Sequence, residues 1–350
     1  MPMEIDPALA RDLKKADLRY VHDGTSGITR KRNGDSFKYF DTDGKDMTSE
    51  IVVHRIETLA IPPAWSHVWI CPSPSGYVQA IGFDEKNRKQ YIYHPEWTKI
   101  SQENKFNKMV FFGEALPAIR EKITKDMTLE ALERDKIIAT VIWLLEHTLI
   151  RIGNSEYAQD NNSFGLTTLR NRHVTVRGKN ITFEFRGKSG VQQSISISHP
   201  RIAKIIKECI ELPGYEIFQY LDEGGQRHTV DSADVNDYLK LLTGEYITAK
   251  DFRTWGGTVL CATSLRVIGP SATPVDGKKN ISRAVKKVSQ HLHNTASVCR
   301  NYYIHPVVLE TYQKNTLIPH FDSIYKNYNR EKAGMPREEF ATLSLLRKYS

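Results

Sequence analysis

The stretch from Leu132 to Ile150 limits the possible folds more than any other part of the chain. It holds seven closely spaced aliphatic residues, which are Ile137, Ile138, Val141, Ile142, Leu144, Leu145 and Leu149. A helix that is apolar on most of its sides must be buried. Its most apolar part, Ile137 to Ile150, contains Glu146 and His147 and is too short to span a bilayer. The sequence therefore predicts a helix inside a globular domain and argues against membrane insertion.

Length and charge indicate a basic protein with room for two domains. The chain has 350 residues, of which 40% are hydrophobic, and a formal net charge of +8. Such a charge favours a polyanionic partner such as nucleic acid, although positive charge also serves solubility.

The cysteines and the first residues bear on the compartment. Four cysteines lie far apart without a C-x-x-C pair, namely Cys71, Cys209, Cys261 and Cys299. This spacing suggests neither a disulfide framework nor a zinc site, and it fits a reducing cytoplasm. The first ten residues lack the apolar core and flanking positive charge of a signal peptide.

The sequence from Leu18 to about Pro95 reads as short strands and turns. Asn33-Gly34 suits a tight hairpin turn, because both residues tolerate positive φ values. We predict strands at residues 27–32, 36–40, 68–71, 77–81 and 89–94. They form a small antiparallel sheet, and residues 1–102 are assigned to a β-rich N-terminal domain.

Beyond a predicted hinge near Pro95 to Lys108 the pattern becomes mainly helical, and residues 103–350 are assigned to a second domain. Helices are predicted at residues 132–150, 202–212, 218–221, 232–242, 258–268 and 282–292 and in part of the tail after Pro319. Strands are predicted at residues 166–176, 181–186 and 191–198, and residues 269–280 read as a linker. The predicted fold class is α+β.

Several basic residues stand at the ends of these elements. Arg151 follows the apolar helix, which Gly153 is expected to end, so its simplest role is to stabilise the helix dipole. Lys188 lies at the tip of the turn between two strands, where a solvated charge is the usual explanation. Lys250 and Arg253 share one side of a helix. Each position has an ordinary structural explanation when it is taken alone.

The stretch from Asn294 to Pro306 marks the junction of two helices. Thr295 or Ser297 can cap the second helix, and two adjacent tyrosines, Tyr302 and Tyr303, follow. The simplest interpretation is that one tyrosine packs in the core and the other is exposed. The junction would nevertheless present a tyrosine hydroxyl beside cations.

Arg151, Lys188, Arg253 and Tyr303 make chemical sense as a single site. Nearby cations lower the pKa of a tyrosine hydroxyl from its ordinary value of about 10. Two guanidinium groups match the oxygens of a phosphate, and a protonated lysine can donate a proton to a departing alkoxide. This set predicts phosphoryl transfer to a tyrosine. The scheme requires no metal or other cofactor.

Six motifs in order resemble the type IB DNA topoisomerases, most closely the small bacterial and poxviral branch. The motifs are I-P-P-A-W at Ile61–Trp65, R-I-G-N at Arg151, G-L-T-T-L at Gly165, F-R-G-K-S-G around Lys188, K-D-F-R-T-W-G at Lys250, and N-T-A-S-V-C-R-N-Y-Y-I-H-P at Asn294. Any one of them is weak evidence, whereas six in the family's order are very specific. The resemblance runs from about Leu18 to about Pro319.

The resemblance implies covalent catalysis by Tyr303 and not by Tyr302. Tyr303 would attack a DNA phosphodiester, giving a 3′-phosphotyrosine and a free 5′-hydroxyl. The linkage conserves the bond energy, so religation needs no ATP. Rotation of the free strand between the two steps relaxes supercoils.

The resemblance also assigns the other catalytic residues. Arg151 and Arg253 would hold the non-bridging phosphate oxygens, and Lys188 would protonate the 5′-oxygen. Asn294 would donate one more hydrogen bond to the phosphate, and Lys250 matches a second lysine that supports departure of the leaving group. The family fold pairs the β-rich N-terminal domain with a helical catalytic domain bearing a three-stranded antiparallel sheet.

The sequence departs from the family at two adjacent positions. Asn294 stands where poxviral members have histidine, and His293 stands where glycine is usual. Solvent exposure is the simpler interpretation of His293, and a partial replacement of the missing histidine is the alternative. Four residues match DNA contacts of the family, namely Gln90, Tyr91, Tyr93 and Tyr157. The expected partner is double-stranded DNA held by a monomeric clamp in the cytoplasm, at the nucleoid.

Two alternatives use much of the same chemistry. A tyrosine recombinase has a similar Arg, Lys, Arg and Tyr set, but a histidine usually stands where this chain has Lys250. The I-P-P-A-W motif and the β-rich N-terminus also favour the topoisomerase. A basic, non-catalytic DNA-binding protein would use the cations only for phosphate contacts and would form no covalent adduct.

Overall fold

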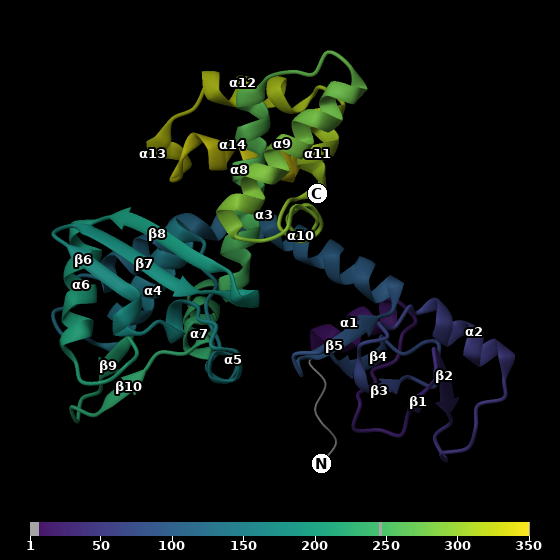
Figure 1. The fold of residues 1–350 in the computed structure, drawn as a ribbon. Helices are drawn as coiled ribbons and strands as arrows, with labels where there is room; N and C mark the ends of the chain where they lie inside the picture. Colours follow the sequence, from purple (N-terminus) through teal and green to yellow (C-terminus); the bar gives the residue numbers. More distant parts are fainter. Residues whose placement is uncertain (1–6, 245–246, 350) are drawn as a thin grey trace. The chain divides into compact units, whose positions relative to one another are not determined.

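The computed structural model describes residues 7–244 and 247–349 and divides into two compact units (Figure 1). The first unit extends to Lys105 and the second begins at Phe106. The division falls inside the helix α3, Pro95–Asp126, so the segment that was predicted as a hinge is helical. Residues 1–6, including most of the stretch tested for a signal peptide, lie outside the described residues.

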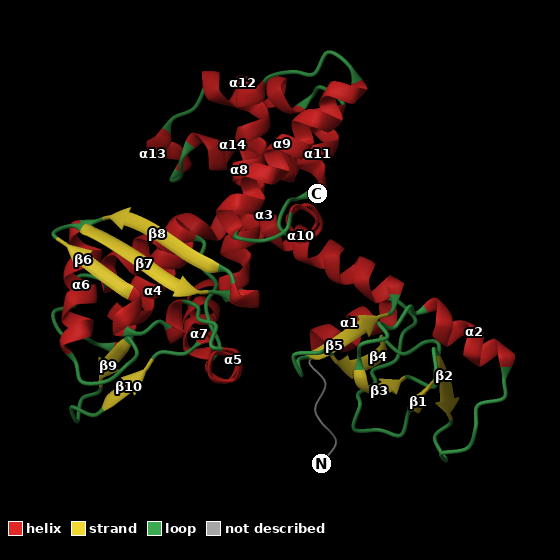
Figure 2. Ribbon diagram, in the orientation of Figure 1, coloured by secondary structure: helices red, strands yellow, loops and turns green. Residues whose placement is uncertain are grey.

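The first unit is built on a five-stranded antiparallel sheet with the order β2-β1-β3-β4-β5 (Figure 2). Its elements are α1 (Pro7–Lys15), β1 (Ile28–Asn33), β2 (Ser36–Phe40), α2 (Glu50–Thr58), β3 (Ser66–Ile70), β4 (Val78–Phe83) and β5 (Lys89–Tyr93). The predicted small sheet is therefore confirmed. Asn33 pairs with Ser36, so the tight turn is made by Gly34 and Asp35, with Gly34 at φ 62°.

The I-P-P-A-W motif forms a turn that one arginine holds in place. Arg30 on β1 donates hydrogen bonds to the backbone carbonyls of Ile61 at 3.1 Å, Pro62 at 2.6 Å and Trp65 at 3.1 Å. Arginine suits this position because its planar fork carries several donors. The motif thus has a clear structural role within the first unit.

The second unit is mainly helical, with a three-stranded antiparallel sheet of order β6-β7-β8. Its elements after α3 are α4 (Arg134–Thr148), α5 (Ser155–Asn161), β6 (Val174–Arg177), β7 (Asn180–Arg186), β8 (Gln192–Ser198), α6 (Pro200–Glu211), β9 (Gln219–Leu221), β10 (Arg227–Thr229), α7 (Ser232–Thr243), α8 (Ala249–Ile268), α9 (Pro274–Leu292), α10 (Ala296–Tyr302), α11 (Pro306–Gln313), α12 (Leu317–Lys326), α13 (Arg330–Ala333) and α14 (Arg337–Tyr349). This confirms the α+β class and the predicted sheet.

Two hydrophobic cores organise the second unit. Helix α4 is at the centre of the first, where Ile137, Ile138 and Val141 are fully buried, as predicted for this stretch. The second core joins α8, α9 and α11 to the tail helices α12 and α14. Ile304, the neighbour of Tyr303, is fully buried in this second core. The tail therefore helps to fix the segment that carries the tyrosines.

Predictions of secondary structure were also wrong at three other segments. Residues 166–173 form two short 3-10 turns, and only Val174–Arg177 is a strand, because the backbone of the first turn bonds to the loop after α4. Residues Gln219–Leu221 form β9, which pairs with β10, and not a helix. Helix α9 already begins at Pro274, within the predicted linker, because Thr273 caps it and proline suits the first helical position.

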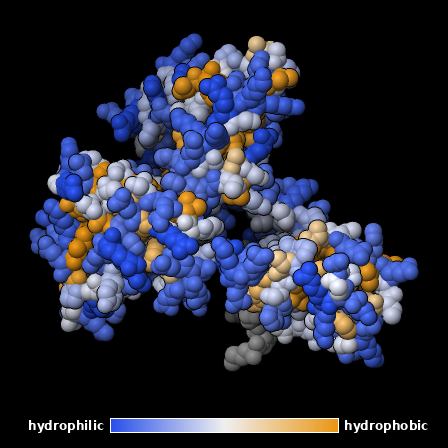
Figure 3. Space-filling model, in the orientation of Figure 1, coloured by the Kyte–Doolittle hydropathy of each residue, from blue (hydrophilic) through white to orange (hydrophobic). Residues whose placement is uncertain are grey.

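Hydrophilic side chains cover most of the face drawn in Figure 3, and apolar side chains form only small patches there. Within residues 7–244 and 247–349, no helix is both long enough and apolar enough to cross a bilayer.

Candidate active site

Tyr303 lies directly after a short helix whose start and end are both fixed. The Thr295 hydroxyl caps α10 by accepting a hydrogen bond from the Val298 amide at 3.3 Å. The Tyr303 amide donates to the Cys299 carbonyl at 2.9 Å. Tyr302 is 45% exposed, whereas Tyr303 is half-buried. The two tyrosines therefore differ in surroundings, and Tyr303 faces the cations described below.

Arg253 is a buried arginine beside the Tyr303 ring. It lies one turn into α8 and is 4% exposed. Its guanidinium donates hydrogen bonds to the carbonyls of Leu149 and Leu292, the latter at 2.8 Å, and lies 5.2 Å from the centre of the Tyr303 ring. Both carbonyls belong to residues at helix ends, so α8 holds the ends of α4 and α9 beside the tyrosine.

Arg151 is not at the end of a helix, contrary to prediction. Helix α4 ends at Thr148, and Leu149 takes the left-handed conformation with φ 53°. Arg151 lies in the loop that follows, where its carbonyl accepts a hydrogen bond from the Leu166 amide at 2.9 Å. Gly165 permits this approach, because a Cβ there would lie 2.5 Å from the Gly153 nitrogen. The G-L-T-T-L motif thus supports Arg151.

Asn294 contacts Arg151 directly, and its amide nitrogen is available for another acceptor. The Arg151 guanidinium donates a hydrogen bond to Asn294 Oδ1. Because a guanidinium only donates, the amide oxygen must face it. Asn294 Nδ2 is buried and has no partner within the described residues. A buried donor without a partner is costly, and a phosphate oxygen would satisfy it.

Lys188 occupies the tip of the β7–β8 hairpin, as predicted. Arg186 pairs with Gln192 at the end of the two strands, and the connection contains residues with left-handed backbone, Ser189 at φ 62° and Gly190 at φ 77°. The Lys188 side chain is exposed. It can therefore reach a ligand without breaking packed contacts.

Lys250 lies in the first turn of α8 and is exposed, three residues before Arg253. Its positive charge is among those that lower the pKa of Tyr303. The first turn is anchored by Asp251, whose carboxylate accepts hydrogen bonds from the Thr248 amide at 2.8 Å and from Lys108 at 3.2 Å. Both cations of this motif are therefore held near the tyrosine.

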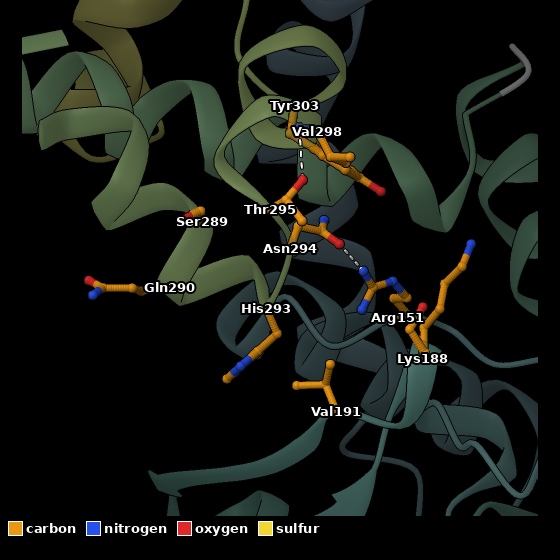
Figure 4. Close-up of a pocket in the computed structure, with 11 residues that line it drawn as sticks. Arg151, Lys188, Val191, Ser289, Gln290, His293, Asn294, Thr295, Val298 and Tyr303 are labelled. Carbon is orange, nitrogen blue, oxygen red and sulfur yellow. Dashed lines mark hydrogen bonds between the residues drawn. The ribbon is translucent and has the colours of Figure 1, made fainter. Parts of the chain in front are cut away.

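Four of the predicted catalytic residues line a cavity of about 550 Å³ (Figure 4). Its walls include Arg151, Lys188, His293, Asn294, Thr295 and Tyr303. A second cavity, of about 230 Å³, also has Arg151 and Lys188 in its walls and continues beside Tyr157. Arg253 and Lys250 line neither cavity. The Arg253 guanidinium lies beside the ring of Tyr303, which does line the first cavity. The structure thus brings together residues that are far apart in the sequence.

The charges of the site favour the tyrosinate. Burial raises the pKa of the Tyr303 hydroxyl, but Arg253, Arg151 and Lys250 outweigh burial and the net pKa lies below the ordinary value. Burial and the charge of Arg151 lower the pKa of Arg253 to about 10, which leaves it charged at neutral pH. Burial also lowers the pKa of Arg151.

His293 does not occupy the place of the missing histidine. It ends α9 in the left-handed conformation, with φ 49°, which glycine adopts without strain. In Figure 4 its imidazole turns away from Arg151 and Asn294, although His293 lines the same cavity. Burial, together with Arg253, Arg151 and His291, lowers its pKa, which favours the neutral imidazole.

The proposed DNA-contact residues of the first unit do not share one face. Tyr91 and Tyr93 are exposed on the edge strand β5 and stack at 5.9 Å between ring centres. Gln90 points to the other face, where its amide donates to the Asp84 carboxylate at 3.0 Å. Only the two tyrosines therefore form a continuous surface. Tyr157 lies in α5, beside the second cavity.

Three residues in the walls of the first cavity lie outside the motifs of the sequence analysis, namely Val191, Ser289 and Gln290. They carry no chemical signature, and only the packing of α9 near the β7–β8 hairpin brings them there. The described residues contain no group of three or more His, Cys, Asp or Glu side chains that could hold a metal ion.

Comparisons with known proteins match nearly the whole chain. A family model described as the catalytic core of eukaryotic DNA topoisomerase I matches residues 94–326, and one described as the N-terminal domain of bacterial DNA topoisomerase IB matches residues 36–84. DNA topoisomerase 1B of Acanthamoeba polyphaga mimivirus is 32% identical over 308 residues, which cover 86% of this chain and 91% of the viral protein. DNA topoisomerase 1B of Vaccinia virus (strain Copenhagen) is 21% identical over 234 residues, 66% of this chain and 71% of its own.

Proposed function

The chain belongs to the type IB DNA topoisomerase family, and from this premise we propose that Tyr303 is the nucleophile of a metal-independent DNA strand transfer at the cavity described above. The family makes the protein an isomerase that acts on DNA topology. The recombinase and the non-catalytic DNA-binding protein are not favoured by these matches. The observation that carries the residue assignment is the arrangement of two arginines around one half-buried tyrosine.

The arrangement supports phosphoryl transfer to Tyr303. A phosphate that enters the cavity meets the Arg151 guanidinium and the unpaired Nδ2 of Asn294 on one wall. Arg253, close to the tyrosine ring, favours the tyrosinate and contributes positive charge where the transition state gains negative charge. The cations thus stabilise both the nucleophile and the pentacoordinate phosphate. In this scheme Arg253 acts partly through Tyr303.

Lys188 suits the role of the acid that protonates the leaving 5′-oxygen. In an in-line displacement the attacking and leaving oxygens lie on opposite sides of the phosphorus. Tyr303 lines the first cavity, whereas Lys188 also borders the second. The leaving strand would accordingly continue along the second cavity, past Tyr157. Lys250 would add positive charge near the tyrosine.

Around this site we place double-stranded DNA held by both units of a monomeric clamp. The stacked pair Tyr91 and Tyr93 offers the first unit an aromatic contact surface. The net charge of +8 supports a salt-dependent grip on phosphates. We propose a cytoplasmic location at the nucleoid, where double-stranded DNA would be available.

Replacing Asn294 tests the role of its free amide. We expect Asn294→Ala to slow DNA cleavage by about 10- to 100-fold, because a hydrogen bond to a charged phosphate oxygen contributes about 1.5–3 kcal/mol. Asn294→Asp should slow it by at least about tenfold more, because a carboxylate beside the phosphate adds repulsion. Single-turnover cleavage of an oligonucleotide measures both. An Asp variant as active as the Ala variant would contradict the contact.

The pH dependence of cleavage follows from the lowered pKa of Tyr303. Because the pKa of Tyr303 is lowered, a larger fraction of it is ionised at neutral pH than of free tyrosine. The cleavage rate should therefore rise with pH to a plateau, with a midpoint below about pH 10. Lys250→Ala removes one of the charges that lower this pKa, so the midpoint should move to higher pH. Single-turnover rates from about pH 6 to about pH 10 give both midpoints. An unmoved midpoint would show that Lys250 does not act on the tyrosine.

Plasmid relaxation tests the proposed activity. Purified protein is incubated with supercoiled plasmid in EDTA and without ATP, and the topoisomers are separated on a gel. The proposal predicts complete relaxation in steps of single turns. Binding of the plasmid without relaxation under these conditions, but with relaxation after Mg²⁺ is added, would contradict metal-independent chemistry.

A further inference from the structure

Resting on Tyr303 as the nucleophile, we propose that Thr258 and Gly257 on α8 are positioning residues that set where the Tyr303 backbone lies. They are separate from the cations that contact phosphate. Both are buried, and Thr258 has no exposed surface. They belong to the helix that also carries Arg253, so a single rigid element would set the nucleophile and its nearest cation together.

The Thr258 hydroxyl bridges the backbone on both sides of Ile304, directly after Tyr303. It donates a hydrogen bond to the Tyr303 carbonyl at 3.3 Å and accepts one from the His305 amide at 3.0 Å. A hydroxyl has one proton to donate and lone pairs to accept, so both bonds can form at once. The two bonds span the short connection between α10 and α11. They therefore fix the connection between the two helices, which begins with Tyr303 at the end of α10.

Gly257 permits the close approach that these bonds require. A Cβ built on Gly257 would lie 2.6 Å from the Tyr303 carbonyl oxygen and 3.4 Å from the Tyr303 Cβ. The first contact is with backbone, which cannot move aside as the end of a flexible side chain can. Any larger residue at position 257 would therefore push the Tyr303 backbone away from α8.

The spacing along α8 places these residues in one register. Arg253 and Gly257 are four residues apart and hence on the same face of the helix, one turn apart. Arg253 lies 5.2 Å from the Tyr303 ring, while Gly257 and Thr258 meet its backbone. Because α8 is rigid, the contacts that Arg253, Gly257 and Thr258 make with Tyr303 together set the distance between the Arg253 guanidinium and the tyrosine. A displacement of about 1 Å at a reacting group can cost about 100-fold in rate.

The test compares two buried threonines of the same helix. Thr258→Val removes the bridging hydroxyl while keeping the shape of the side chain, and Thr258→Ser restores the hydroxyl. Thr254→Val is the matched control, because Thr254 is also fully buried and, within the described residues, its hydroxyl hydrogen-bonds only to the Lys250 carbonyl of its own helix, at 3.4 Å. Single-turnover cleavage, DNA affinity and the melting temperature are measured for all of them.

We expect Thr258→Val to lower the cleavage rate by about tenfold or more with unchanged DNA affinity, Thr258→Ser to recover to within about threefold, and Thr254→Val to stay within about twofold. Gly257→Ala should lower the rate as Thr258→Val does. Equal rates for Thr258→Val and Thr254→Val would overturn the inference, as would a loss that follows the melting temperature alone. If the wild type forms no covalent adduct with DNA, the proposed function itself fails, and this outcome is distinct.

Discussion

Tyr303→Phe is expected to abolish plasmid relaxation, a loss of more than about 10⁴-fold, because removing a covalent nucleophile leaves no alternative path. The ring and its packing beside Arg253 would remain, so the fold and DNA binding should be unchanged. Relaxation is measured over a dilution series of each protein. This substitution has the largest predicted effect.

Tyr302→Phe is the matched control for this prediction. Tyr302 is the adjacent residue, is 45% exposed, and lies outside the walls of the described cavity. The Tyr302→Phe variant should relax plasmid at close to the wild-type rate. If Tyr302→Phe were inactive and Tyr303→Phe active, the nucleophile would be misassigned.

Lys188→Ala should lower the cleavage rate by about 10²- to 10⁴-fold, the usual contribution of a general acid. Because the lysine is exposed at the hairpin tip, the melting temperature should hardly change. An alkoxide needs a proton to leave, whereas a thiolate leaves readily without one. A substrate with sulfur in place of the 5′-bridging oxygen should therefore restore cleavage by Lys188→Ala.

Arg151→Ala provides the comparison for the lysine. Arg151 is assigned to non-bridging oxygens, so the sulfur substrate should not restore cleavage by this variant. Rates of the two variants on the two substrates separate the roles. Equal rescue of both variants, or of neither, would contradict the assignment of Lys188 as the acid.

The sequence predicted which side chains come together at the site better than it predicted the local backbone that positions them. Arg151, Lys188, Asn294 and Tyr303 were assigned from motif order, and the structure brings them to one cavity. These motifs are readable because each needs a specific side chain at a specific spacing. The site roles themselves remain predictions until the variants are measured.

Local backbone explains what the sequence could not predict. The end of α4 was misplaced because Leu149, and not a glycine, adopts the left-handed conformation there. Tertiary hydrogen bonds to the Arg151 loop turned residues 166–168 from a strand into a 3-10 turn. Gln90 was grouped with Tyr91 and Tyr93 although neighbouring strand residues face opposite sides. In each case partners distant in the sequence, or the alternation of a strand, decided the outcome.

The contribution of α8 to the tyrosine backbone also lacked a sequence signal. A buried threonine in a helix usually bonds to its own helix, as Thr254 does, and only the structure shows that Thr258 bonds to another segment. A glycine inside a helix lowers the stability of the helix, and the sequence alone offers no reason for Gly257. The structure supplies the reason, because the Tyr303 carbonyl packs directly against Gly257.

The most direct test of the central claim is to identify the residue that becomes joined to DNA. The protein is incubated in EDTA with a duplex in which the strand released by cleavage is too short to stay annealed, so religation cannot occur. The adduct is then denatured and digested with protease, and the peptide that carries DNA is sequenced by mass spectrometry. The account predicts attachment through a 3′-phosphate to Tyr303. Attachment to Tyr302, attachment through a 5′-phosphate, or cleavage of the duplex without a protein–DNA adduct would contradict this assignment.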